Sequence, residues 1–310
     1  MMNVLPKVSV VMAVYNGGEY LKLAIESILE QSFTDFEFII INDGSTDSTP
    51  NVLTEYAHRD RRIRIISREN KGLVASLNEG ISEARAPLIA RMDADDIALP
   101  HRLFEQLNYL EKNPNVVCIG TAQIIIDDDG DELTTLKVPT DNDKIQRLLL
   151  SGHCPLEHPS VMYRTESVNQ VGGYRKEYET AEDYDLWLRL SEVGEFANIN
   201  KPLLKYRYLN SSISASNQQK QKNLTMRACN EAWRRRGIEG QFSATEEWRA
   251  TSSISSQHRF ALKFGWWAFN YNNKKAAIKY AKRSIRLKPF AFEGWNLLLN
   301  AFIKLKGSHE

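Results

Sequence analysis

The 310-residue chain has only three cysteines and lacks any long apolar run. Cys118, Cys154 and Cys229 are odd in number and lie far apart, without the close spacing of metal-binding pairs. We therefore expect free thiols and a cytoplasmic location, rather than a disulfide-bonded secreted protein. No apolar stretch approaches the roughly 20 residues that a membrane-spanning helix needs. The N-terminal segment also lacks a basic stretch followed by an apolar one, so no signal peptide is expected.

Charge is distributed unevenly along the chain, although its net value is only +1. Residues 218–310 contain 18 Lys and Arg against 6 Asp and Glu, so this part carries +12, while the remainder carries −11. The asymmetry predicts two parts, a main domain over residues 6–217 and a basic helical extension over residues 218–310. The acidic main domain argues against a nucleic acid as the partner.

Strand and helix patterns alternate through the first 120 residues. Short apolar runs typical of buried parallel strands are separated by amphipathic stretches. The expected strands are 8–15, 36–41, 63–66, 88–92 and 116–120, and the expected helices are 20–30, one opening at Pro50, 72–84 and 100–112. Short links between alternating strands and helices predict an α/β fold with a mostly parallel sheet flanked by helices.

The pattern changes in the second part of the main domain. "IIIDDDGDEL" predicts a hairpin with its turn at "DDDG". Residues 158–164 and 200–209 predict further strands on either side of a helix at 181–194. Beyond them the pattern is helical. Residues 272–289 and the following "FEGWNLLLNAFIKL" are typical of one tetratricopeptide-like hairpin, although a plain helical hairpin fits equally well.

Polar clusters follow four of the expected strands: "AVYNGGEY", "NDGSTD", "ENKGL" and "DADD". Because the carboxyl ends of parallel strands share one edge of a sheet, these clusters are expected to meet there. Asp93, Asp95 and Asp96 would repel one another at that edge, and the sequence offers no obvious cluster of cationic side chains to offset them. Mn²⁺ or Mg²⁺, which prefer oxygen ligands, is the expected positive partner, bound together with a diphosphate.

A second acidic run, "DDDGDE" at residues 127–132, serves as a comparison. It is more acidic than "DADD", yet Asp and Gly are ordinary residues of a hairpin turn. Its glycine is not placed as in an EF-hand loop. We therefore interpret this run as a turn and assign the metal to "DADD".

Seven motifs, in this order and spacing, resemble the family 2 glycosyltransferases, which are inverting, nucleotide-sugar-dependent enzymes of GT-A fold. The motifs are "VVMAVYN" (10–16), "INDGSTDST" (41–49), "ENKGLVASLN" (69–78), "ARMDADDIALPHRL" (90–103), "HPSVMYR" (158–164), "VGGY" (171–174) and "AEDYDLWLRL" (181–190). The resemblance covers about residues 6–210. It implies a GT-A fold and transfer of a sugar from a nucleotide-diphosphate sugar, with a UDP-sugar as the expected donor. The acceptor would be a hydroxyl of a glycan or lipid-linked molecule in cell-surface polysaccharide synthesis.

The resemblance also implies roles for individual residues. The nucleotide would be bound by Ala13, Tyr15, Asp43, Lys71, Arg91 and Asp93, with Tyr15 and Asp43 flanking the base. Asp95, together with Asp93, would hold Mn²⁺ or Mg²⁺. Asp183 would be the catalytic base that takes the proton of the acceptor hydroxyl, and Glu182 and Trp187 would shape the acceptor pocket.

The sequence departs from the family pattern in two places. Leu209 stands where many members carry a histidine that completes the metal site. The segment after the third strand ends in "SLN" (76–78), where an arginine is common. Lys71 or Arg91 would then have to serve the phosphates.

Some of these residues have a plainer interpretation that the sequence leaves open. Asp183 near a helix start would stabilise that helix whether or not it is a base. His153 and His158 fit structural roles as well as acceptor contacts. For the whole protein, the alternatives are a sugar nucleotidyltransferase and a non-catalytic scaffold that binds a nucleotide sugar.

The basic extension raises a separate alternative. Trp266, Trp267 and Phe269 are typical of packing between helices, but Lys and Arg residues are dense around them. A basic helix with aromatic edges also fits a peripheral contact with an anionic membrane surface. Such a contact would place the protein at the inner face of the membrane.

Overall fold

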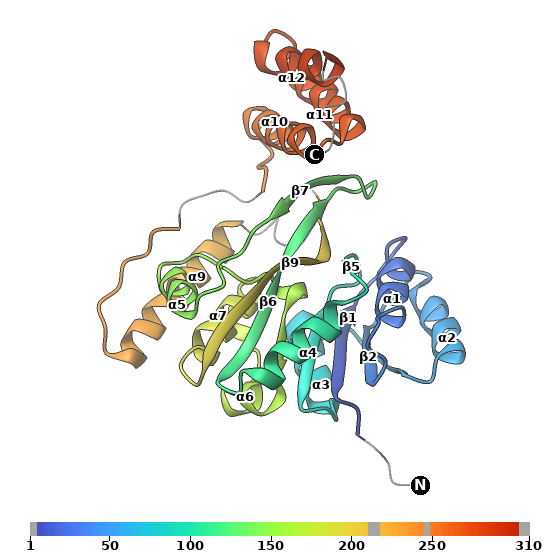
Figure 1. Cartoon of the computed structure of the whole chain (residues 1–310), viewed down its shortest axis with the longest axis vertical. Coiled ribbons are helices and arrows are strands. Elements are labelled where there is room, and N and C mark those ends of the chain that lie inside the picture. Colours follow the sequence, from blue (N-terminus) through green and yellow to red (C-terminus); the bar gives the residue numbers. More distant parts are fainter. Residues whose placement is uncertain (1–4, 210–217, 245–248, 304–310) are drawn as a thin grey trace. The chain divides into compact units, whose positions relative to one another are not determined.

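The computed structural model describes residues 5–209, 218–244 and 249–303 (Figure 1). It divides into two compact units. Of the described residues, the first unit contains 5–123, 137–205 and 219–244, and the second contains 124–136, 206–209, 218 and 249–303. The predicted domain boundary after residue 217 stays a prediction.

A nine-stranded sheet runs in the order β3-β2-β1-β4-β8-β6-β9-β5, with β7 paired to β6. Its strands are β1 (Val8–Val14), β2 (Phe36–Asp43), β3 (Ile63–Arg68), β4 (Leu88–Met92), β5 (Ile97–Ala98), β6 (Val116–Ile126), β7 (Glu132–Leu136), β8 (Met162–Arg164) and β9 (Glu195–Arg207). β3, β2, β1 and β4 are parallel. β8 runs antiparallel to both β4 and β6, and β5 is antiparallel to β9, so the sheet is mixed beyond the first four strands.

Helices cover this sheet in the first unit. The helices of this unit are α1 (Leu21–Leu29), α2 (Thr49–Arg59), α3 (Leu73–Glu83), α4 (Arg102–Lys112), α5 (Asn142–Leu150), α6 (Thr165–Gln170), α7 (Glu182–Leu190) and α9 (Gln218–Arg236), with short 3₁₀ turns η1 (His158–Ser160) and η2 (Lys176–Tyr178). α9 packs on α5 and α7 through Cys229 and Trp233. Every residue of β2 is buried, as expected for a central parallel strand covered on both faces. The predicted α/β fold with a sheet flanked by helices is therefore confirmed.

Two helices, α5 and α6, had no counterpart in the sequence-based prediction. α5 begins at a capping residue, because the Asp141 side chain accepts a hydrogen bond from the Lys144 N–H at 2.9 Å. α6 has only six residues, which is too short for a helical period to be recognised.

The motifs "VGGY" and "AEDYDLWLRL" are held together by a buried ion-pair group. Asp185, 1% exposed, pairs with Arg175 and with Arg189. Arg189 also donates to the carbonyl oxygens of Val171 and Gly173, at 2.6 and 2.7 Å. The group ties α7 to the segment that precedes it. These charged residues are therefore part of the scaffold that positions the first turn of α7.

Asn78 of α3 holds the same segment from the other side. Its Nδ2 donates to the Tyr174 carbonyl at 2.8 Å, and its Oδ1 accepts from the Tyr174 N–H at 2.8 Å. A Cβ atom on Gly173 would lie 2.6 Å from Asn78 Oδ1, and Gly173 has a φ of +66°, so glycine is required there. This contact joins "SLN" to "VGGY".

The second unit contains α10 (Ile254–Asn270), α11 (Lys274–Leu287) and α12 (Phe292–Ile303), with the end of the β6–β7 hairpin. α11 and α12 form the predicted helical hairpin. Lys279 donates to Asp127 and Asp129 of the hairpin turn, at 2.8 and 2.6 Å, and Lys275 pairs with Asp131 at 3.2 Å. The acidic run "DDDGDE" thus lies in a turn whose charge is offset by lysines. Among the described helices, none is long and apolar enough to cross a membrane.

We expect Asp185→Asn to lower the free energy of unfolding by about 3 kcal/mol, because it leaves two guanidinium groups without their buried counter-charge. Urea denaturation followed by fluorescence measures the loss. Glu55→Gln is the matched control, since it breaks an exposed i,i+4 pair with Arg59 and should cost about 0.5 kcal/mol or less. Equal losses in the two variants would contradict the scaffold role of Asp185.

Candidate functional site

The register of three neighbouring strands determines which residues meet at the carboxyl edge of the sheet. Val14 of β1 lies opposite Asn42 of β2, and Met12 of β1 lies opposite Met92 of β4. The residues that follow these pairs are Tyr15 and Asp43 in the first case, and Ala13 and Asp93 in the second. Four residues predicted to bind the nucleotide therefore leave three adjacent strands at one edge.

Hydrogen bonds join the loops after β1 and β2. Asn16 Oδ1 accepts from the Thr46 N–H at 2.8 Å, and the Asn16 N–H donates to Ser45 Oγ at 2.9 Å. The Gly17 N–H donates to Thr49 Oγ1 at 2.9 Å. Asn16 adopts a φ of +51°, which asparagine tolerates better than most residues. These bonds make "VYN" and "GSTDST" one structure, beside which the Tyr15 side chain is 53% exposed.

Asp43 is buried and already has three hydrogen-bond donors. It pairs with Arg68, and it accepts from the backbone N–H groups of Lys71 and Gly72 at 2.8 and 3.0 Å. Gly44 allows this arrangement, because a Cβ there would lie 2.6 Å from the Asn70 backbone nitrogen. Lys71 therefore contributes its backbone to Asp43, while its side chain is exposed.

Arg68 is a site residue that the sequence-based reasoning missed. Besides Asp43, it contacts Glu79 at 2.6 Å and Ser76 Oγ at 2.9 Å. Its signal in the sequence was available: it is the last residue of an apolar strand, directly before the "ENKGL" cluster. The sequence does not show the pairing of β2 with β3, and it is this pairing that places Arg68 opposite Asp43.

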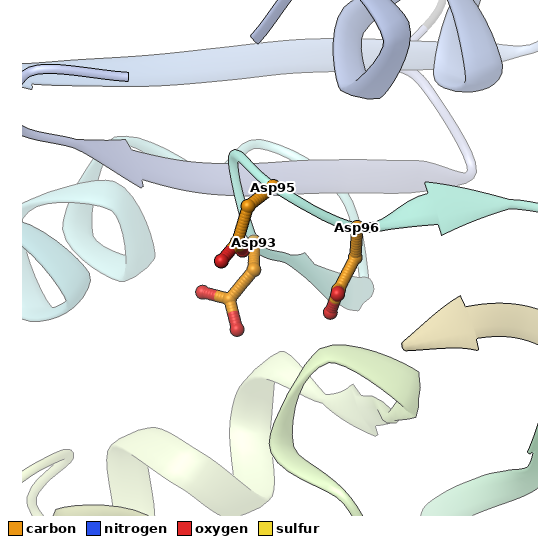
Figure 2. A group of neighbouring side chains, drawn as sticks. All are labelled: Asp93, Asp95 and Asp96. Carbon is orange, nitrogen blue, oxygen red and sulfur yellow. The ribbon is translucent and has the colours of Figure 1, made fainter. Parts of the chain in front are cut away.

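The "DADD" cluster lies in the turn between β4 and β5. Figure 2 shows the side chains of Asp93, Asp95 and Asp96 projecting to the same side of this turn. One oxygen from each carboxylate lies within 4.8 Å of the others. Asp93 and Asp95 are half-buried and Asp96 is buried. Three convergent carboxylates are a donor set that suits Mn²⁺ or Mg²⁺.

The sequence showed no obvious cluster of cationic side chains for these acids, but the structure places two buried arginines at this turn. Arg91, 3% exposed, forms an ion pair with Asp93, and the fully buried Arg102 donates to the Arg91 carbonyl at 2.6 Å. Burial opposes the charge of Arg91, but the Asp93 carboxylate raises the pKa of Arg91 above its ordinary value. Burial, and secondly Arg91, lowers the pKa of Arg102 to about 9. Arg102 begins a different element, α4, so its place was not evident from sequence.

Glu182 and Asp183 occupy the first turn of α7. Glu182 accepts from the Thr180 N–H at 2.7 Å, and Asp183 Oδ1 accepts from the Tyr184 N–H at 2.7 Å. The capping interpretation of Asp183 is thus met in part, because its carboxylate does bind a backbone N–H at the helix start. Thr180 has a φ of +89°, a strained conformation for a β-branched residue that directs the chain into this turn.

Burial raises the pKa values of both carboxyl groups. The pKa of Glu182 rises to about 7, because of burial and then because of the Asp183 charge. Burial also raises the pKa of Asp183, while Arg91 lowers it and Asp93 raises it. Asp183 is therefore within electrostatic reach of the "DADD" segment, although the two lie about 90 residues apart in the sequence.

Trp187 lies in the core rather than on a surface. It is fully buried, with ring centroids of His158, Tyr163 and Phe196 at 5.8, 6.3 and 6.4 Å. His158 Nε2 lies 2.7 Å from the Tyr174 hydroxyl, and burial lowers the pKa of His158 well below its ordinary value. A neutral His158 in this aromatic cluster supports α7 from behind.

Leu209 contributes its backbone to the second unit. Its carbonyl oxygen accepts from Arg249 Nη1 at 2.8 Å. Its aliphatic side chain offers no metal-binding atom. Among the residues that the structure describes, the group at "DADD" that could hold a metal consists of three carboxylates.

A sequence model described as "Glycosyl transferase family 2" matches residues 9–172. Over 219 residues, the chain is 36% identical to the O-antigen biosynthesis glycosyltransferase WbnJ of Escherichia coli, covering 69% of this chain and 85% of that protein. Over 213 residues, it is 38% identical to the putative glycosyltransferase EpsE of Bacillus subtilis (strain 168), covering 66% of this chain and 74% of that protein.

Solved structures share the fold at low sequence identity. S. aureus TarS 1-349 in complex with UDP-GlcNAc superposes with a TM-score of 0.61 at 14% identity, covering 96% of this chain and 89% of that one. The mannosyltransferase PcManGT from Pyrobaculum calidifontis, in complex with GDP-Man and Mn²⁺, gives a TM-score of 0.55 at 15% identity, covering 97% and 87%. The predicted GT-A fold is confirmed by this likeness.

We expect the stability of Glu182→Gln relative to the wild type to depend on pH. Because folding raises the pKa of Glu182 from 4.5 to about 7, the unfolded chain releases this proton at lower pH than the folded chain does. As pH rises from 4.5 to about 7, the free energy of unfolding of the wild type should therefore fall. The fall should be at most roughly 3 kcal/mol, at ~1.4 kcal/mol per pKa unit. The amide cannot ionise, so the variant should not lose this stability.

Urea denaturation of both proteins across this window, with a chelator present, measures the effect. The two should differ least at pH 4.5, which serves as the internal control, and the variant should be the more stable above pH 7. A difference that is the same at every pH would contradict the raised pKa.

Proposed function

This chain belongs to glycosyl transferase family 2, and we propose that the transfer it catalyses is metal-dependent and inverts the anomeric carbon of the sugar. The donor in this proposal is a nucleotide-diphosphate sugar, with UDP as the nucleotide, and the acceptor group is a hydroxyl. The observation that carries the proposal is the strand register, because it brings Tyr15, Asp43 and Asp93 to one edge of the sheet.

The nucleotide in this proposal lies across the ends of β2, β1 and β4. Tyr15 offers an exposed ring for stacking on the base beside Ala13, and the Asp43 carboxylate is the acceptor for a base N–H. Arg68, Lys71 and Gly72 hold Asp43 in place through its two oxygens. A carboxylate that is already fixed by backbone N–H groups loses little conformational freedom when it binds a base.

Asp95 and Asp93 are the residues that would hold Mn²⁺ or Mg²⁺. Their carboxylate oxygens are hard ligands within 4.8 Å of each other, which fits such an ion. The ion would offset the negative charge that develops on the departing diphosphate. Arg91 reduces the repulsion between the acids, because its ion pair with Asp93 neutralises part of their charge in addition to the metal.

Asp183 is the proposed base. A carboxylate whose pKa is raised by burial is a better proton acceptor than an ordinary aspartate, and the positive charge of Arg91 opposes part of this rise. As the acceptor oxygen attacks the anomeric carbon, its proton passes to Asp183, and the bond to the diphosphate oxygen breaks. One base and a single displacement give inversion. Glu182 and, from the core, Trp187 would shape the acceptor pocket around it.

The acceptor is proposed to be a growing surface glycan or its lipid-linked precursor. The relative WbnJ is named for O-antigen biosynthesis, which supports this class of acceptor at 36% identity. All three cysteines are free, which supports a reducing cytoplasmic location, where nucleotide sugars are made.

We expect Asp183→Asn to reduce kcat by roughly 10²- to 10⁴-fold, because the amide cannot accept the acceptor proton. The fraction of enzyme with ionised Asp183 grows with pH, so kcat/KM of the wild type should rise as pH rises through the elevated pKa of this group. UDP release from a panel of UDP-sugars measures both. Asp35→Asn, an exposed aspartate of the same unit, is the control and should keep wild-type turnover. Normal turnover in Asp183→Asn would eliminate this choice of base.

We expect Asp95→Asn to raise the Mn²⁺ concentration needed for half-maximal activity by about tenfold or more, since it removes a charged oxygen ligand. Asp129→Asn is the matched control, because it alters the second acidic cluster, which is neutralised by Lys279. The control should keep the wild-type metal dependence. Turnover that continues in excess chelator would rule out the metal.

A further inference from the structure

The exposed apolar side chains of the second unit gather on α12 and the residues before it. Six large apolar side chains there are more than half exposed: Phe290, Phe292, Trp295, Leu299, Phe302 and Ile303. Phe292, Trp295, Leu299 and Phe302 follow the spacing i, i+3, i+7, i+10, so they lie on one helix face. We call these four residues the α12 stripe.

The α12 stripe is not the face that holds the helical hairpin together. Gly294, Leu297 and Ala301 form the opposite, buried face of α12. A Cβ on Gly294 would lie 2.9 Å from both Ser284 Oγ and Ile285 Cγ1 of α11, so the two helices are already in close contact there. α12 is therefore apolar on two faces, of which the hairpin uses one. A contiguous exposed apolar face marks an interaction surface more reliably than scattered residues do.

The helical hairpin is rich in cations. Lys274 of α11 lies beside the α12 stripe, with its Nζ 5.8 Å from the centroid of the Phe302 ring. Lys275, Lys279, Lys282 and Arg286 follow the spacing i, i+4, i+7, i+11 and form a row on another face of α11. The first two pair with acids of the β6–β7 turn, and Lys282 and Arg286 are exposed. Residues 249–303 contain ten Lys and Arg but one acid, Glu293.

We propose that the α12 stripe, together with Lys274 and the exposed cations of α11, docks this unit on an anionic lipid surface. An apolar helix face inserts at the boundary between headgroups and acyl chains, and the cations bind the lipid phosphates. A second copy of the chain is the poorer occupant, because two faces with the same excess of positive charge would repel each other. The docking itself is independent of the transfer reaction. Only its use, bringing the enzyme to a lipid-linked acceptor, rests on the proposed function.

The proposal moves the membrane face away from the aromatic residues that the sequence singled out. Trp267 and Phe269 of α10 pack against the core cluster of this unit, and the Trp267 ring lies 5.5 Å from that of Phe264. Trp266 is half-buried and contacts Phe269 edge-on at 5.3 Å. Trp267 and Phe269 therefore pack against the core of this unit, as the plainer interpretation predicts, and Trp266 contacts Phe269 within α10.

Flotation of the full-length chain with lipid vesicles tests the apolar part of the proposal. Wild type should bind vesicles of phosphatidylcholine with phosphatidylglycerol at least about tenfold more strongly than vesicles of phosphatidylcholine alone. Leu299→Ser with Phe302→Ser should weaken binding to the anionic vesicles by about tenfold or more. Leu23→Ser with Phe104→Ser is the matched control, since both side chains are 47% exposed on the first unit. The control should bind like wild type.

A second pair of variants tests the charges. Lys282→Gln with Arg286→Gln should weaken binding to anionic vesicles by about 25-fold, at about fivefold for each cation lost near the surface. Lys22→Gln with Arg61→Gln, which removes one exposed lysine and one exposed arginine from the first unit, should leave binding unchanged. High salt should weaken the wild type and leave little further effect of the charge variant.

Three results would overturn the proposal: equal binding to neutral and anionic vesicles, unchanged binding of the stripe variant, or a wild-type dimer in solution that the stripe variant converts to a monomer while vesicles capture neither. UDP release, measured separately on the same variants, should stay at the wild-type rate. A failure of vesicle binding with normal turnover therefore speaks against the docking surface, and a failure of turnover with normal binding speaks against the proposed reaction.

Discussion

The parallel pairing of β1 with β2 on one side and with β4 on the other is the constraint on which the site depends. Side chains alternate between the faces of a sheet, so a slip of one residue in either pairing would turn the residues at the strand ends to the opposite face. The observed register places Tyr15 beside Asp43 and Ala13 beside Asp93 at the carboxyl edge. The loops that follow are then joined by hydrogen bonds through Asn16, which makes the edge a single preformed surface.

Acids crowded at this edge are made tolerable by arginines of β3 and β4. Asp43 pairs with Arg68, and Asp93 pairs with Arg91. Burying such charges is costly unless each has a partner, so the arginines are as much a part of the site as the acids. Glu182 and Asp183 have a different environment, in which burial raises their pKa values. That contrast separates groups that hold charge from a group suited to accept a proton.

In the second unit, crowded acids are again paired with cations, which come from the basic C-terminal part of the sequence. Lys275 and Lys279 offset the acids of the β6–β7 turn, although these residues come from parts of the chain about 150 positions apart. The acidic run and the basic helices, which as separate stretches suggest unrelated roles, are thus one neutralised contact. The exposed apolar face of α12 and the cations of α11 outside this contact form the surface inferred to meet lipid.

Local pattern was sufficient for the parallel strands, the helical hairpin, the polar strand-end clusters and the family to which they belong, because each of these is recorded in short-range periodicity or in motif spacing. It was not sufficient for α6, whose six residues hold too few turns to show a period. The sequence of "AEDYDLWLRL" also does not distinguish the roles of its two aspartates. Asp185 pairs with arginines of the scaffold, whereas the charges of Arg91 and Asp93 shift the pKa of Asp183. Only the tertiary structure assigned those roles, paired Arg68 with Asp43, placed Arg102 against the Arg91 carbonyl, buried Trp187 and exposed α12. The reason is that burial and these pairings depend on neighbours that are distant in the sequence.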